Sequence, residues 1–289
     1  MPELIRYATL AASGHNAQPR QFAIRPNAVE IHPDLTRRLP VVDPDDRELW
    51  ISLGCALENL VIAARTAGCA AEIIYPDDAD FIGVRLVADR PSAGPLYDAI
   101  PLRQNTRSAY DGRPIAGSVH ARLQALPLEP GIALHFAPDP AGMKVVSDSV
   151  AQANLIQYAG KAFLKELPFW LRFNKREALA SFDGLYAKCS GHPAVPRCLG
   201  RMILTGATPQ TQAEADAAIL ASSPGAIVIA SNAEGKSAWV RTGRVYERMA
   251  LAMTSLTIKS AFLNQPIEVA EIRSQFQTRW VSEMPAPNC

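Results

Sequence analysis

The sequence predicts an α+β protein made of two tandem halves, residues 1–100 and 101–289, with two long core helices. Short strand-like runs alternate with longer helix-like runs along the chain. The 289 residues, 48% of them hydrophobic, suit one large or two fused domains. A Trp-x3-Gly-x3-Glu pattern also occurs twice with one offset of 189 residues (239 − 50, 243 − 54 and 247 − 58), at Trp50, Gly54 and Glu58 and again at Trp239, Gly243 and Glu247.

The first half opens with a helix-like segment, residues 2–12. Further along, Asp43 is a natural N-cap and Pro44 a natural first helical residue, and acidic side chains follow in the first turn. The helix that they begin is apolar on nearly every side, which predicts that it is buried, and Gly68 is suited to its C-terminal cap. The predicted strands of this half are Phe22–Ile24, Val29–His32, Glu72–Tyr75 and Val84–Ala88.

The second half is predicted to alternate helices and strands up to the second core helix. Its segment 168–210 mixes aromatic residues with glycines and prolines, and we interpret it as an irregular lid with short helices. The predicted helices are 115–126, 141–166 with interruptions, Thr211–Leu220 and the core helix around Trp239, and the predicted strands are 132–137 and Gly225–Ser231.

The repeated pattern places Trp, Gly and Glu along one face of each core helix, because they are four residues apart. A glycine inside a helix costs about 1 kcal/mol relative to alanine. Its presence at the same position of both helices indicates that another backbone packs closely there. We therefore expect the two helices to pack together, and coincidence between two buried helices is the alternative.

A polar stretch near the start of the chain, residues 12–22, is rich in Ser, His, Asn and Gln. It is typical of a loop that faces a polar ligand, but also of a capping turn. The stretch resembles the Ser-x-x-Asn-x-Gln-Pro segment of the FMN-dependent nitroreductase superfamily, and most closely its internally duplicated, Acg-like branch. The matching positions are Ser13, Asn16, Gln18 and Pro19, and His15 lies among them as a hydrogen-bonding residue.

A second polar stretch carries Arg103, Arg107 and Arg113 within eleven residues. Arginine forks match phosphate oxygens in bidentate geometry, although such a cluster is also typical of a solvated basic turn. The stretch resembles the Arg-x-Ser/Thr-x-Arg motif with which nitroreductases hold the FMN phosphate and ribityl chain. Arg103, Asn105 and Arg107 are the matching positions, with Asn105 in place of the usual Ser or Thr.

The resemblance implies a function and a nitroreductase-like fold, in which the two tandem halves form an intramolecular pseudo-dimer around the two long core helices. Nitroreductases are homodimers in which one subunit supplies the arginine motif and the other the loop, so a fused chain with one of each is expected to hold one FMN. The implied activity is NAD(P)H-dependent reduction of nitroaromatic or quinone-type acceptors, with FMN performing the redox chemistry and no catalytic side chain. The alternative is an FMN-sequestering protein whose flavin lies under the lid. Arg20 stands where the family has Trp, which adds a charge near the expected flavin site.

The composition of the chain indicates which kinds of partner, cellular location and metal to expect. A net charge of +1 gives no reason to expect nucleic acid or a membrane, so we expect a small-molecule electron acceptor. Five irregularly spaced cysteines and the lack of a signal peptide pattern favour a reducing, cytoplasmic location. The spacing Cys189-x2-His192-x5-Cys198 matches no zinc module, and no metal is expected. Because the two predicted halves are fused in one chain, we expect a monomer with pseudo-two-fold symmetry, and further dimerisation stays open.

Overall fold

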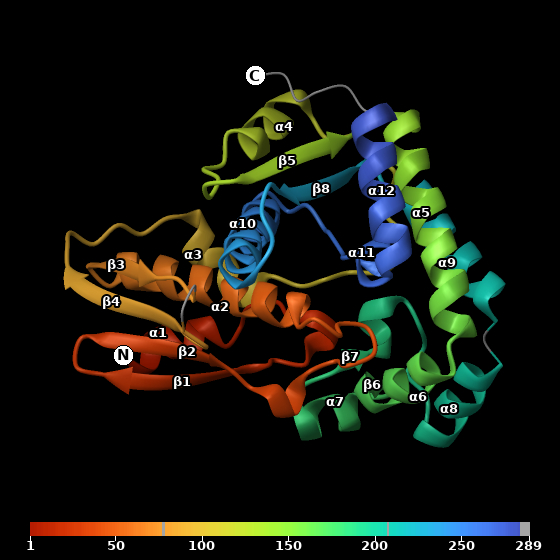
Figure 1. Ribbon diagram of the computed structural model, residues 1–289, viewed down its shortest axis with the longest axis horizontal. Helices are drawn as coiled ribbons and strands as arrows, with labels where there is room; N and C mark the ends of the chain where they lie inside the picture. Colours follow the sequence, from red (N-terminus) through yellow and green to blue (C-terminus); the bar gives the residue numbers. More distant parts are fainter. Residues whose placement is uncertain (77–78, 207, 284–289) are drawn as a thin grey trace. The chain divides into compact units, whose positions relative to one another are not determined.

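The computed structural model describes residues 1–76, 79–206 and 208–283 (Figure 1). Its mixture of helices and strands agrees with the predicted α+β class. The chain forms two compact units of three segments each. The first unit comprises residues 1–104, 117–133 and 229–259, and the second comprises residues 105–116, 134–228 and 260–289. Neither unit coincides with a predicted half, and the division into tandem halves stays a prediction.

The first unit contains a four-stranded antiparallel sheet in the order β1-β2-β4-β3. Apolar side chains on one face of its two middle strands, among them Val29, Ile31 and Val84, are fully buried in the core. All four predicted strands are confirmed, each extended or shifted by one to three residues. Their bounds are β1 (Arg20–Arg25), β2 (Ala28–Pro33), β3 (Cys69–Ile74) and β4 (Ile82–Ala88).

Helix α1 (Pro2–Ala8) ends four residues before the predicted end at residue 12. The carbonyl groups of Thr9, Ala11 and Ala12 accept hydrogen bonds from the Arg20 guanidinium. These carbonyls are satisfied by a side chain, so the chain leaves the helix without leaving them unpaired.

Helix α2 (Arg47–Thr66) begins three residues after the predicted start, with Asp46 as N-cap. Asp43 still performs the predicted capping from a distance, because its carboxylate accepts the backbone N–H groups of Glu48 and Leu49, both at 2.9 Å. Gly68 follows the C-cap residue with φ +80°, in the left-handed region that glycine adopts readily. By length and composition α2 could cross a membrane, but 72% of its apolar window is buried within the protein, which is typical of a core helix.

Helix α10 (Lys236–Ser255) packs on α2 through reciprocal contacts. A Cβ on Gly54 would overlap the carbonyl oxygen of Val240, and a Cβ on Gly243 would overlap that of Ile51. Gly54 and Gly243 are 189 residues apart, and so are Ile51 and Val240 (240 − 51). The predicted close backbone approach is therefore confirmed. Short helices α3 (Pro95–Ala99) and α4 (Gly117–Gln124, predicted as 115–126) complete this unit.

The second unit is mostly helical, with a core that includes Val145, Val150, Leu220, Phe276 and Trp280. Its predicted helix 141–166 is observed as two helices that part at Gly160. Thr208 and Pro209 begin α9, so that helix starts two residues before its predicted start. The helices are α5 (Pro140–Ala159), α6 (Lys161–Trp170), α9 (Pro209–Ala221), α11 (Gln265–Glu268) and α12 (Ala270–Glu283).

Strands β5 (Ile132–Ala137) and β8 (Ala226–Ser231) pair with each other where the chain passes from one unit to the other. Both confirm predicted strands. The segment predicted as a lid, of which residue 207 lies outside the described residues, contains the expected short helices, α7 (Lys175–Ser181) and α8 (Arg197–Thr205). It also contains a parallel pair of two-residue strands, β6 (Leu171–Arg172) and β7 (Leu185–Tyr186).

Candidate functional site

The polar loop between α1 and β1 has an unusual backbone. His15, Asn16 and Gln18 have φ values of +47°, +52° and +53°. Residues other than glycine rarely adopt this left-handed conformation, and each instance persists only when the surroundings impose it. The loop is therefore held in a defined shape by contacts with its neighbours.

Those contacts come from the loop itself and from two nearby elements. The Ser13 hydroxyl accepts the backbone N–H of Gln18 at 3.0 Å, and the Arg37 Nε donates to the carbonyl of Ala17 at 2.5 Å. The Gly14 N–H donates to the hydroxyl of Ser52 on α2 at 3.2 Å. Ser13 thus bonds the backbone of its own loop, as in the turn that the sequence left open, although its side chain does not cap the short 3-10 helix Gly14–Asn16.

The side chains predicted to bind the cofactor differ in exposure. Asn16 is exposed, Ser13, His15 and Gln18 are half-buried, and Pro19 is buried. Each of His15, Asn16 and Gln18 has an interaction within the protein. The loop therefore presents polar groups at the surface while Pro19 is packed beneath them.

Arg20 lies behind this loop, with an exposed fraction of 8%. Its guanidinium donates to the carbonyls of Thr9, Ala11 and Ala12 at 2.6 to 3.4 Å. Burial lowers the pKa of Arg20 to about 10, against the opposite effect of the Glu247 carboxylate. Although the sequence predicts that Arg20 adds a charge near the flavin, this side chain also supports the loop from within.

Arg103 lies close to the base of the same loop, where both contact Glu247 of α10. The Arg103 Nε is 3.1 Å from Glu247 Oε1, and the Ala12 N–H donates to Glu247 Oε2 at 3.3 Å. The Glu247 side chain is fully buried, and this burial raises its pKa while Arg103 acts in the opposite direction. The Arg103 Nη2 donates to the carbonyl of Leu10 at 3.2 Å in an exposed hydrogen bond.

Asn105 and Arg107 belong to the second unit, and Arg103 to the first. Asn105 forms an isolated parallel bridge with Ser260, and the Arg107 N–H donates to the carbonyl of Cys189 at 2.9 Å. Burial raises the pKa of Tyr158 to about 12, and the positive charge of Arg107 acts against this rise. The half-buried Arg107 side chain therefore lies near a tyrosine that is kept protonated.

A second group of buried charges, which the sequence does not single out, surrounds Glu58 of α2. Arg244 Nε is 2.9 Å and Arg248 Nε 2.7 Å from the Glu58 carboxylate. Both arginines also contact Glu129, at 2.7 and 2.9 Å. Tyr75 donates its hydroxyl to Glu129 at 3.0 Å. The group pairs two guanidinium groups with two carboxylates and is electrically balanced.

The sequence pattern contains the signal for Glu58 and Glu247, because both belong to the repeat. It does not indicate their partners. Arg244 comes three residues before Glu247 and Arg248 directly after it, whereas the structure pairs both arginines with Glu58. Which glutamate these arginines pair with is determined only by the packing of α2 on α10.

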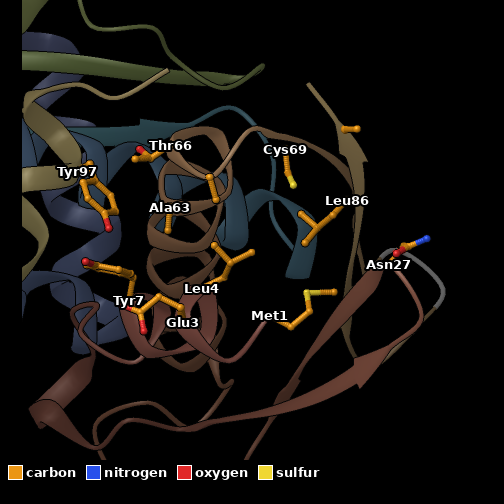
Figure 2. Close-up of a pocket in the computed structure, with 12 residues that line it drawn as sticks. Met1, Glu3, Leu4, Tyr7, Asn27, Ala63, Thr66, Cys69, Leu86 and Tyr97 are labelled. Carbon is orange, nitrogen blue, oxygen red and sulfur yellow. The ribbon is translucent and has the colours of Figure 1, made fainter. Parts of the chain in front are cut away.

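A cavity of about 690 Å³ lies elsewhere in the first unit, between α1, the end of α2 and the β3-β4 edge. Figure 2 shows Leu4, Tyr7 and Tyr97 among its lining side chains. The rings of Tyr7 and Tyr97 are 4.7 Å apart. None of the predicted cofactor-binding residues lines this cavity. Among the described residues, no group of three His, Cys, Asp or Glu side chains is arranged to hold a metal ion.

No protein-family model matches the chain. Two curated proteins of Mycobacterium tuberculosis are similar to it, one from strain CDC 1551 / Oshkosh and one from strain ATCC 25618 / H37Rv, and each is named "putative NAD(P)H nitroreductase". Both are 29% identical over 290 residues, which cover 93% of this chain and 77% of the relative. This similarity supports the predicted relationship to the nitroreductase family.

Proposed function

We propose that this chain is an FMN-binding flavoprotein of the nitroreductase type. In this proposal it takes reducing equivalents from NAD(P)H and passes them to nitroaromatic or quinone-type acceptors. The observation that carries the proposal is the similarity to two proteins named NAD(P)H nitroreductases over 93% of the chain. The loop and arginine motifs add FMN as the specific flavin.

The residues of the loop and of the arginine motif fit an anionic flavin. In the first unit, Arg20 and Arg103 lie with the single carboxylate of Glu247, and among the described residues the buried Nε atoms of both arginines have no hydrogen-bond partner. A buried excess of positive charge favours a negatively charged ligand nearby. By the family resemblance, the residues that would bind FMN are Arg103, Asn105, Arg107, Ser13, His15, Asn16, Gln18 and Pro19.

When bound, FMN supplies the hydride and electron transfer chemistry. The chain's own residues bind and orient it, and their positive charge favours the more negative, reduced state. We further propose that α2 and α10 are the two copies of a duplicated unit, as in the Acg-like branch, and that one FMN binds per chain. The reciprocal glycine contacts support this reading.

An absorption spectrum of the purified protein, followed by anaerobic addition of NADH or NADPH, tests the proposal. We expect about one flavin per chain, bleaching by at least one nucleotide, and reoxidation by a nitroaromatic or a quinone. A bound flavin that neither nucleotide reduces would favour the alternative, a sequestering protein in which the segment 168–210 covers the flavin. A protein that binds no FMN on incubation would overturn both.

Arg107 and Arg113 provide a matched test of the arginine motif. Arg113 is exposed and paired with Asp111, while Arg107 is half-buried. Because a charge-assisted hydrogen bond to phosphate contributes about 1.5 to 3 kcal/mol, Arg107→Gln is expected to weaken FMN binding by tenfold or more. Arg113→Gln should leave it unchanged, as measured by flavin fluorescence titration. Equal effects of the two variants would contradict the assignment of Arg107.

A further inference from the structure

Glu58 and Glu247 are at the same position of the two core helices, yet their surroundings differ. The neighbours of Glu58 include Arg244 and Arg248 of α10. The positions that correspond to these arginines on α2 are Cys55 and Asn59 (244 − 189 and 248 − 189), and neither is charged at neutral pH. Glu247 therefore receives no arginine from α2 and is paired with Arg103 from outside the helix pair.

The Arg103 guanidinium has an inner and an outer edge. Its inner edge, at Nε, lies 3.1 Å from the fully buried carboxylate of Glu247. Its outer edge, at Nη2, donates to the carbonyl of Leu10 at 3.2 Å, and 11% of the Arg103 side chain is exposed. The Glu58 arginines differ in this respect, because each is bound by two carboxylates. A guanidinium held from behind by one carboxylate keeps donors for a second anion.

Glu247 also holds the base of the polar loop, since its other oxygen accepts the N–H of Ala12. One buried carboxylate thus fixes both Arg103 and the start of the loop in relation to α10. Arg20 adds a second positive charge behind the loop without a direct carboxylate contact.

We propose that Glu247 is a positioning residue, which orients the outer edge of Arg103 for the phosphate of FMN. This inference rests on the proposed function, because it assumes that FMN is the ligand of Arg103. It predicts that the loss of the Glu247 charge lowers the preference of the protein for FMN over riboflavin, which has the same ring system but no phosphate. A residue that only stabilises the fold would change the affinity for both flavins by the same factor.

The experiment measures the dissociation constants of FMN and riboflavin by fluorescence titration for the wild type and for E247Q, R103Q and the double variant. The wild type is expected to prefer FMN at least tenfold, and E247Q and R103Q should each lose most of that preference. The double variant should lose no more than R103Q alone, since both changes remove the same interaction. E58Q, the matched control at the equivalent buried position, should keep the preference within twofold.

The outcomes separate the inference from the proposed function. A wild type that binds neither flavin overturns both. A wild type that binds FMN, with E247Q weakening both flavins equally or with additive losses in the double variant, overturns the inference alone. An E58Q variant that loses the preference to the same extent as E247Q also overturns it. If E58Q does not fold, the double-mutant cycle of E247Q and R103Q still decides whether Glu247 acts through Arg103.

Discussion

The packed pair of helices α2 and α10 has two ends, the first around Glu58 and the second around Glu247. The two ends share the same helix contacts but differ in the charges that surround the glutamate. The contacts that bring α2 and α10 together are reciprocal: each glycine meets the backbone of the other helix, and each tryptophan ring lies under a cation from the other helix. Arg47 lies 5.4 Å from the Trp239 ring centroid and Lys236 lies 5.2 Å from that of Trp50, again 189 residues apart (236 − 47). The carboxylates one turn beyond the glycines, Glu58 and Glu247, have entirely different partners.

The comparison separates the effect of backbone packing, which is the same in both helices, from that of the charges, which differ between Glu58 and Glu247. Close backbone packing tolerates no larger residue than glycine at either crossing position, which explains why both helices have glycine there. Around Glu58 the charges balance and both guanidinium groups are enclosed by carboxylates. Around Glu247 the positive charges exceed the negative, and Arg103 is bound by a single carboxylate. The balanced charges around Glu58 are suited to stability, whereas the surroundings of Glu247 are those to which the proposed function assigns FMN.

The largest effect is expected from neutralising Glu58. E58Q should lower the free energy of unfolding by about 3 kcal/mol, because it leaves Arg244 and Arg248 buried with one carboxylate between them. E247Q should cost less than half of that, because burial already raises the pKa of Glu247 and because Glu247 forms one ion pair where Glu58 forms two. Urea denaturation followed by far-ultraviolet circular dichroism measures both. A larger loss for E247Q than for E58Q would reverse the comparison.

The shared scaffold is tested at the two glycines. G54A and G243A should each lower the free energy of unfolding by about 2 kcal/mol, because overlap with a carbonyl group outweighs the better helix propensity of alanine. The two losses should agree closely, since the overlaps are reciprocal. G117A is the control, because no atom lies within 4 Å of a Cβ at that position. A loss at only one of the two positions would show that the contacts are not equivalent.

The sequence predicts this scaffold better than it predicts the charges. The period of apolar residues and the repeated glycine predict both core helices and their close contact, because those signals lie within single elements. The partners of Glu58 and Glu247 are not readable in this way. They depend on which face of one helix meets the other, and Glu129 and Arg103 arrive from segments far along the chain.

Element boundaries show the same limit. The start of α2 is predicted at Asp43 and Pro44, yet it lies at Arg47, because Asp43 reaches forward to cap the helix while Asp46 adopts the left-handed conformation. Of the site, the polar loop and the arginine motif can be read from the sequence. The anchoring of that loop by Ser52, Arg37 and Glu247 requires the folded structure.

The smallest expected effect concerns the starts of the two helices. Asn232 is at the position before α10 that corresponds to Asp43 before α2 (232 − 43), so D43N gives both helices the same residue there. Burial raises the pKa of Asp43 to about 6, against hydrogen bonds from the Glu48 and Leu49 N–H groups. The folded state therefore binds a proton more tightly than the unfolded state at this residue. Protonation of Asp43 therefore stabilises the folded state as the pH falls through 6, and this stabilisation is absent at higher pH.

Between pH 7 and pH 5 this contribution amounts to about 1 kcal/mol in the wild type. The difference in unfolding free energy between wild type and D43N should therefore shift by that amount in favour of the wild type at pH 5. Urea denaturation at both pH values measures it, and taking the difference cancels the titration of all groups that the two proteins share. A difference independent of pH, or one that shifts in favour of D43N at pH 5, would mean that Asp43 is already ionised throughout this range. In that case its carboxylate caps α2 by charge, and the two helix starts differ in charge as well as in residue.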